Sequence, residues 1–148
     1  MARTEMVVLT NMCMVYDHDG NILVENRTDE HWGGLTFPGG HLEKGEPFVQ
    51  SVIREVYEET GLTIESPKLC GVKQFTHYEG SRYIVFFFKT DKFSGDIHSS
   101  DEGEVFWIKR SELGNYKIAP DFDQMLEVFE SDELSEFYYD SEFNVHLM

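Results

Sequence analysis

Apolar side chains follow two different periods along the first half of the chain. Residues 7–16 are rich in apolar and β-branched side chains, and residues 22–25 have the same character after the turn dipeptide Asp19-Gly20. Such runs around a turn predict two strands, the second returning beside the first. Over residues 47–60 the period changes to intervals of three and four, which predicts an amphipathic helix. Its apolar positions are Phe48, Val49, Val52, Ile53 and Val56.

Both ends of this predicted helix carry local signals. Pro47 suits the first turn, because the N–H group that proline lacks has no intrahelical partner there. Gly61 follows the last periodic residue and suits a left-handed cap. The helix is therefore expected to end at Thr60.

The second half of the chain repeats the order of strands followed by a helix. Strand-like runs occupy residues 69–76, Arg82–Thr90 and 104–108, whereas residues 28–36 have the composition of a loop. A last helix is predicted over residues 121–130, with an extension to 139 left open. Its apolar face consists of Phe122, Met125, Leu126 and Phe129. This order predicts an α+β fold with a mixed sheet flanked by helices.

Length and hydropathy place the chain among small globular proteins. Its 148 residues suit one domain spanning 1–148, with 141–148 left open as a tail. The longest apolar run, residues 83–88, is far shorter than the ~20 residues that cross a bilayer. No signal-peptide pattern opens the chain, so we expect a cytoplasmic protein that does not enter the membrane.

The charge balance is strongly acidic, with 28 acidic residues against 12 basic ones and a net charge of -16. This balance argues against a duplex nucleic-acid partner, which normally meets a basic surface. It would also repel anionic substrates unless a divalent cation became the largest local charge. Two plainer interpretations remain: a solvated acidic surface, or an interaction protein that recruits partners through residues 121–142.

Three carboxylates crowd one and a half turns of the predicted helix. At about 100° per residue, Glu59 lies at the edge of the apolar stripe, with Glu55 one turn earlier and Glu58 nearby. Like charges at this spacing cost a few tenths of a kcal/mol per pair, and burial raises that cost. Convergence on a hard cation such as Mg²⁺ would remove the repulsion, whereas solvation of an acidic face is the alternative.

The segment around this helix, GHLEKGEPFVQSVIREVYEETGL, resembles the Nudix box, G-x5-E-x7-R-E-U-x-E-E-x-G-U, where U is apolar. The nine specified positions all match. They are Gly40, Glu46, Arg54, Glu55, Val56, Glu58, Glu59, Gly61 and Leu62. The resemblance implies a Nudix hydrolase with the α/β/α sandwich of that family.

The resemblance also implies roles for individual residues. It assigns catalysis to Glu46, Arg54, Glu55, Glu58 and Glu59, with Arg54 pairing with Glu46 and orienting the other glutamates. Its metal ligands would be a carbonyl of the glycine pair at Gly40, the carboxylates of Glu55, Glu58 and Glu59, and a later glutamate, Glu104. Mg²⁺ is the expected ion, with Mn²⁺ as a substitute. The general base stays open among Glu55, Glu102 and Glu104.

The implied reaction is attack of water on a phosphorus of a diphosphate, with metal ions bridging the phosphate oxygens. The segment from Trp32 through Phe37-Pro38-Gly39-Gly40 resembles the MutT branch, whose members convert 8-oxo-dGTP to the monophosphate and pyrophosphate. That branch cleans the nucleotide pool and so serves DNA repair. Gly39 would contact the substrate, and Phe37 would stack on the base.

Two acidic residues could recognise the purine edge in that interpretation. Asp121 or Asp123 would accept hydrogen bonds from the base, by analogy with the late loop of the branch. Asp121 could equally cap the last helix. The expected partner is a small nucleotide, and a homodimer is left open.

Two departures keep other substrates open. His41 stands where MutT has lysine, and Tyr78 lies where a tyrosine marks dinucleoside polyphosphate hydrolases. The proline that marks ADP-ribose hydrolases is missing. Another nucleoside diphosphate derivative, such as a dinucleoside polyphosphate or ADP-ribose, is therefore the alternative substrate. A non-catalytic nucleotide-binding module is a further alternative, although such a module would be expected to lose box glutamates.

Overall fold

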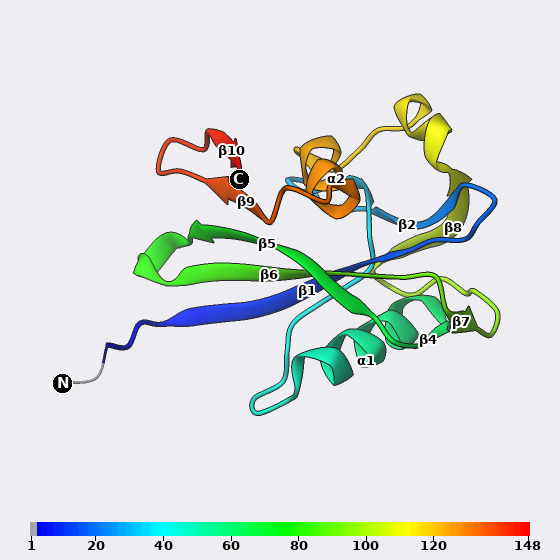
Figure 1. The fold of residues 1–148 in the computed structure, drawn as a ribbon, viewed down its shortest axis with the longest axis horizontal. Helices are drawn as coiled ribbons and strands as arrows, with labels where there is room; N and C mark the ends of the chain where they lie inside the picture. Colours follow the sequence, from blue (N-terminus) through cyan, green and yellow to red (C-terminus); the bar gives the residue numbers. More distant parts are fainter. Residues whose placement is uncertain (1–2) are drawn as a thin grey trace.

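The computed structural model describes residues 3–148, and along the chain groups of strands are separated by helices (Figure 1). The elements are β1 (Val7–Val15), β2 (Asn21–Arg27), β3 (Gly34–Thr36), α1 (Phe48–Thr60), β4 (Thr63–Ile64), β5 (Lys68–Thr76), η1 (Tyr78–Gly80), β6 (Arg82–Thr90), β7 (Phe93–Ser94), β8 (Gly103–Lys109), η2 (Arg110–Asn115), α2 (Phe122–Glu130), β9 (Glu136–Tyr139) and β10 (Val145–Leu147). Here η denotes a 3₁₀ helix. None of the helices in the described part is long and apolar enough to cross a membrane.

The predicted mixed sheet is present, with five strands in the order β1-β6-β5-β9-β10. β1 runs parallel to β6 and β9 parallel to β5, whereas β5–β6 and β9–β10 are antiparallel. A second, antiparallel sheet has the order β3-β2-β8, and β4 pairs with β7.

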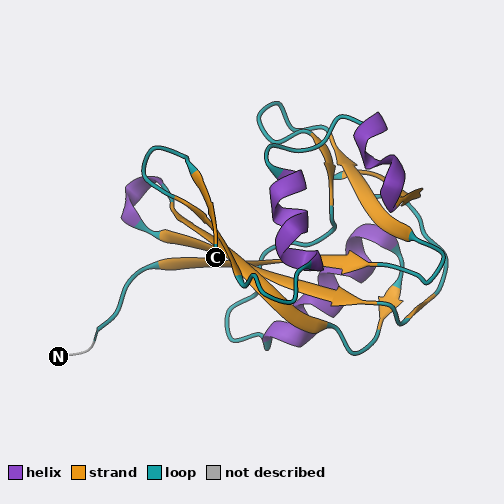
Figure 2. Ribbon diagram, turned by 45° about the horizontal axis from the view of Figure 1, so that its top comes forward, coloured by secondary structure: helices purple, strands orange, loops and turns teal. Residues whose placement is uncertain are grey.

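The two long helices cover opposite faces of the five-stranded sheet (Figure 2). Side chains alternate across β1, so Cys13 packs in the core under α1 whereas Met14 packs in the core under α2. On α1, Val52 and Val56 are fully buried in the core under that helix, whereas Phe48 and Val49 of the predicted apolar face are each 45% exposed. The α2 face predicted from the sequence is buried, led by Phe122 and Phe129. The α/β/α layering is confirmed.

The first two strands do not form the expected hairpin. β1 and β2 meet at one isolated bridge, Tyr16↔Ile22, and then continue into different sheets. The turn at Asp19-Gly20 is present, with Gly20 at φ 83°. Both strands are buried on two faces over much of their length. Such burial is typical of strands inside a layered sheet, whose pairing partners lie far along the chain. Local turn signals therefore did not determine strand pairing.

Three shorter strands replace segments that the sequence predicted otherwise. Residues 34–36, expected in a loop, form β3 against β2. The helical extension to residue 139 is wrong: α2 ends at Glu130, and the Ser131 Oγ accepts hydrogen bonds from the next turn's N–H groups. β9 then pairs with β5, and β10, within the segment left open as a tail, pairs with β9.

The end of α1 follows the predicted cap. Gly61 adopts φ 83°, and its N–H donates to the Tyr57 carbonyl at 2.9 Å. A Cβ at this position would lie 2.4 Å from Cδ2 of His98. The left-handed conformation and the close ring both require glycine.

Replacing Gly61 with alanine is expected to lower the free energy of unfolding by ~2–3 kcal/mol, since the left-handed backbone costs ~1–2 kcal/mol and His98 must also move. Gly45 provides a matched control, because it has φ +77° but nothing within 4 Å of an added Cβ. Chemical denaturation of both alanine variants measures the difference. Equal losses would contradict a packing role for the His98 contact.

Candidate active site

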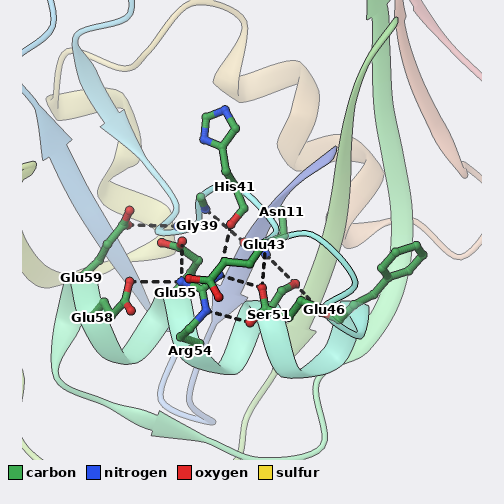
Figure 3. A network of polar contacts seen from close by, with 12 residues as sticks. Asn11, Gly39, His41, Glu43, Glu46, Ser51, Arg54, Glu55, Glu58 and Glu59 are labelled. Carbon is green, nitrogen blue, oxygen red and sulfur yellow. Dashed lines mark hydrogen bonds and ion pairs between the residues drawn. The ribbon is translucent and has the colours of Figure 1, made fainter. Parts of the chain in front are cut away.

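Arg54 lies at the centre of an ion-pair network on α1 (Figure 3). Its Nε and Nη2 donate to the two carboxylate oxygens of Glu46 at 2.7 and 2.8 Å, a planar two-pronged contact. Its Nη1 donates to Glu55 at 2.9 Å and to Glu58 at 3.2 Å. The hydrogen bonds from Arg54 hold the pKa of Glu46 down at about 2. Arg54 thus ties the loop before the helix to two carboxylates on it.

The glycine pair before the helix touches the glutamates directly. The Gly39 N–H donates to Glu59 Oε2 at 3.1 Å, and a Cβ at Gly40 would lie 2.3 Å from an oxygen of Glu55. Asn11 holds the pair in place: its Oδ1 accepts from the Gly40 N–H at 3.1 Å, and its N–H donates to the Gly40 carbonyl at 2.9 Å. A carbonyl has a second lone pair, so Gly40 retains an acceptor site.

Glu59 belongs to a second carboxylate group. Oxygens of Glu25, Glu59 and Glu102 lie within 4.8 Å of one another. Glu25 on β2 is 0% exposed and Glu59 is 3% exposed, whereas Glu102, in the turn before β8, faces solvent. We call these three residues the carboxylate cluster. It comes from three separate elements and opens to solvent at Glu102.

The two buried carboxylates of the cluster are only partly compensated within the part of the chain that is described. Both oxygens of Glu25 and Oε1 of Glu59 have no hydrogen-bond partner. The nearest cation, Arg27, places Nε 3.6 Å from Glu25. Burial raises the pKa of Glu59 to about 10, with Glu102 and Glu25 adding to the effect, and burial also raises the pKa of Glu25.

Such a cluster matches what a hard divalent cation requires. Mg²⁺ takes oxygen ligands. The repulsion between neighbouring negative carboxylates is offset once a cation lies between them. Burying unpaired carboxylates without such an ion would be costly. Glu55 is close enough for Glu102 to raise its pKa, although burial is the larger cause. The arrangement therefore suits a metal centre bordered by Arg54 and the glycine pair.

Glu104, one of the metal ligands implied by the resemblance, lies elsewhere. In the β2–β8 ladder it pairs with Asn26, whereas Glu25 pairs with Val105, so strand alternation directs Glu104 to the opposite face. There it lines a cavity of about 230 Å³ with Phe106. Glu102, two residues earlier, joins the cluster instead.

Glu25 was missed by the sequence analysis. It ends the buried run Ile22-Leu23-Val24-Glu25, in which exposure does not exceed 1%. A carboxylate that continues a fully apolar strand is a signal that could have singled it out, because acids are rarely buried without a partner.

The residues expected to bind the base are dispersed. Phe37 is 0% exposed and packs edge-to-face on Phe122 and Phe129 at 4.8 and 5.0 Å, so the core takes the ring that was expected to stack on a base. Asp123 is exposed and lines a different cavity, of about 380 Å³, beside Leu126. Asp121 precedes α2 at φ 60° without the expected side-chain cap.

Instead of capping the helix, Asp121 contacts the next strand. Its Oδ2 accepts a hydrogen bond from the Tyr139 hydroxyl. Tyr78, the residue that suggested dinucleoside polyphosphates, has a side chain outside the described part of the structure. Asp121 is partly exposed, so both predicted acidic base contacts can be reached from solvent, Asp123 at the other cavity.

Comparisons with known proteins identify a matching domain family and similar proteins. The NUDIX domain model matches residues 7–129. The uncharacterized Nudix hydrolase YvcI of Bacillus subtilis (strain 168) is 34% identical over 73% of this chain and 70% of its own length. The MutT protein of Bacillus halodurans has a TM-score of 0.76 and 30% identity, covering 95% of this chain and 97% of that one.

Two further relatives carry different activities in their names. An 8-oxo-dGTP diphosphatase of Haemophilus influenzae is 29% identical over 58% of this chain and 62% of its own length. An ADP-ribose pyrophosphatase of Methanocaldococcus jannaschii is 28% identical over 61% of this chain and 54% of its own length. The names of the relatives thus differ in substrate.

Proposed function

This chain belongs to the NUDIX domain family, and we propose that it is a Mg²⁺-dependent hydrolase that converts an oxidised purine nucleoside triphosphate, such as 8-oxo-dGTP, to the monophosphate and pyrophosphate. The observation that carries the proposal is the carboxylate cluster beside the glycine pair, in which two buried acids keep three oxygens without a hydrogen-bond partner. The name of the Haemophilus influenzae relative supports the substrate. The cellular role that follows is sanitation of the nucleotide pool, and hence DNA repair, in the cytoplasm.

The residues of the site divide into two groups by what they would do. Glu25, Glu59 and Glu102 would hold the metal, with Glu55, Glu58 and the Gly40 carbonyl at its border. A bound Mg²⁺ would supply positive charge to the diphosphate oxygens and lower the pKa of water. Arg54 and Asn11 would fix the carboxylates and the glycine pair before substrate arrives.

The proton of the attacking water needs an acceptor near the cluster. Glu55 suits this role because it is held by Arg54 and because burial raises its pKa above that of an ordinary glutamate, which makes it a stronger base. Glu102 is the second candidate, and the position of Glu104 on the other face argues against a role for it as base.

A matched pair of variants tests which late glutamate serves the metal. Glu102→Gln is expected to weaken Mn²⁺ binding ~10-fold or more, whereas Glu104→Gln is expected to change it less than ~2-fold. The reason is that Glu102 belongs to the cluster and Glu104 does not. Electron paramagnetic resonance of free Mn²⁺ measures both affinities. The reverse order would contradict the assigned positions.

The name of the Methanocaldococcus jannaschii relative favours ADP-ribose as the second candidate substrate. A competitive screen with Mg²⁺ separates the two by comparing 8-oxo-dGTP, dGTP, a dinucleoside tetraphosphate and ADP-ribose. The proposal expects the highest kcat/KM for 8-oxo-dGTP, with release of pyrophosphate. Preference for either of the last two would reject the triphosphate assignment, and absence of metal-dependent turnover on all four would favour a non-catalytic binding module.

A further inference from the structure

A buried lysine that the proposed reaction does not use lies on the α2 side of the five-stranded sheet. Lys73 on β5 is 7% exposed, and its Nζ is 3.9 Å from the Met125 sulfur, a weak acceptor. Among the residues and side chains that the structure describes, the lysine has no oxygen acceptor at hydrogen-bonding distance. Aromatic rings surround Nζ, with centroids at 5.1 to 5.8 Å. They belong to Trp32, Phe75, Phe137 and Tyr139.

The environment of Lys73 leaves its hydrogen-bonding capacity unused. An ammonium group carries three N–H donors, and a buried donor without an acceptor is unfavourable. The ring faces offset part of that cost through cation–π attraction. Burial lowers the pKa of Lys73 to about 8, although Asp121 acts in the opposite direction. The group is therefore ready to donate to an oxygen atom that a ligand would bring.

A row of rings connects Lys73 to the loop of the candidate active site. Phe75 stacks on Tyr83, with 5.1 Å between the ring centroids and 19° between the ring planes. The centroid of the Tyr83 ring lies 6.3 Å from that of the His41 ring. His41 directly follows Gly39 and Gly40, and its carbonyl accepts from Arg54 at 3.2 Å. Phe75 and Tyr83 are half-buried and His41 is exposed, so the row is accessible to solvent. We call these three rings the aromatic row.

An acceptor lies beside the donor at the far end of this row. Asp121 is half-exposed and close enough to Lys73 to affect its charge. Since Tyr139 donates to Oδ2, the other oxygen of Asp121 remains available to a ligand. Lys73 and Asp121 thus present N–H donors next to a carboxylate acceptor. A base edge with a ring carbonyl adjacent to a ring N–H complements this arrangement.

We propose that Lys73 recognises the ring carbonyl of a nucleobase stacked on the aromatic row, which makes the preferred ligands oxo-substituted bases. This inference rests on the proposed function, because it takes the ligand to be a nucleotide whose phosphates lie at the glycine pair. Asp121 would accept from the adjacent ring N–H. Adenine has ring nitrogens but no carbonyl oxygen, so it would leave Lys73 without its best acceptor.

Inosine and adenosine monophosphates provide a direct test, because they differ at purine C6 and in the proton on N1. Isothermal titration with Mg²⁺ present is expected to show ~10-fold tighter binding of inosine monophosphate to the unmodified protein, the range of a charge-assisted hydrogen bond. Equal binding, or tighter binding of adenosine monophosphate, would overturn the proposal without any variant being needed.

Variants then locate the preference. Lys73→Met fits the apolar surroundings and is expected to weaken inosine monophosphate binding ~10-fold while changing adenosine monophosphate binding less than ~3-fold. Lys89→Met is the control, since Lys89 donates to the Phe129 carbonyl at 3.1 Å, outside the aromatic row, and should keep the preference. An unchanged preference in Lys73→Met would overturn the assignment to Lys73.

This binding experiment stays separate from the proposed hydrolysis. The ligands are monophosphates, so no diphosphate bond is broken during the titration. If the protein turned over none of the screened substrates, the proposed function would fail while the preference for inosine monophosphate could still be measured. If turnover were found but Lys73→Met kept the preference, the role of Lys73 would fail alone.

Discussion

Replacing Glu59 with glutamine is expected to reduce kcat by at least ~100-fold while the protein stays folded. Glutamine has nearly the same shape, but it removes one charge from a cluster in which metal-based charge stabilisation is worth several kcal/mol. The same change removes a buried acid, one oxygen of which has no hydrogen-bond partner among the described residues. The metal-free variant should therefore be more stable than the unmodified protein at neutral pH. Steady-state kinetics and thermal unfolding in EDTA measure the two effects.

The opposite directions of these two effects make the test specific. A variant that lost activity through misfolding would also lose stability. Glu127→Gln serves as a control, because Glu127 is exposed on α2 and contacts neither the cluster nor the aromatic row. Its activity should remain within ~2-fold of normal. Near-normal turnover of Glu59→Gln would contradict a metal role for that residue.

The metal-free protein is expected to lose stability as pH rises, and Mg²⁺ is expected to restore it. The pKa of Glu59 is raised from 4.5 to about 10, so folding favours the protonated form. That stabilisation is complete below 4.5 and is lost progressively as pH approaches 10. A cation replaces the proton, so saturating Mg²⁺ should raise Tm by ~5–10 °C in mildly alkaline buffer and by less in acid.

Scanning calorimetry from about pH 6 to about pH 9, with EDTA or with Mg²⁺, measures this dependence. The Glu59→Gln variant is the matched control, since it has no carboxylic acid to titrate at that position and should show a flatter profile in EDTA. Glu25, whose pKa burial also raises, acts in the same direction. Stability in EDTA that stayed constant or increased with pH would contradict a raised pKa of Glu59.

Local periodicity and motif spacing were sufficient to predict the helix α1, its C-terminal cap and the position of Glu59 on it. The three- and four-residue spacing placed α1 within one residue of its observed start, and Gly61 ended it as predicted. The wheel position of Glu59 beside the apolar stripe agrees with its burial. These features depend on contacts between residues close in sequence, which spacing describes well.

Features that depend on long-range pairing were not accessible in the same way. The partners of β1 and β2 lie far along the chain, and the possible helical extension to residue 139 overran β9, whose partner β5 also lies far from it in the sequence. The membership of the cluster also depends on strand alternation, which brings in Glu25 and excludes Glu104. Lys73 gave no signal, because its aromatic surroundings come from β5, β9 and the loop before β3.

Crystals grown with Mn²⁺ and a non-hydrolysable triphosphate analogue would show whether the carboxylate cluster binds the metal. Anomalous scattering is expected to place an ion about 2.1–2.3 Å from carboxylate oxygens of Glu59 and Glu102, with Glu25 at its buried side and the phosphates on the side of the glycine pair. Anomalous density elsewhere, or none with these three side chains unchanged, would contradict the account.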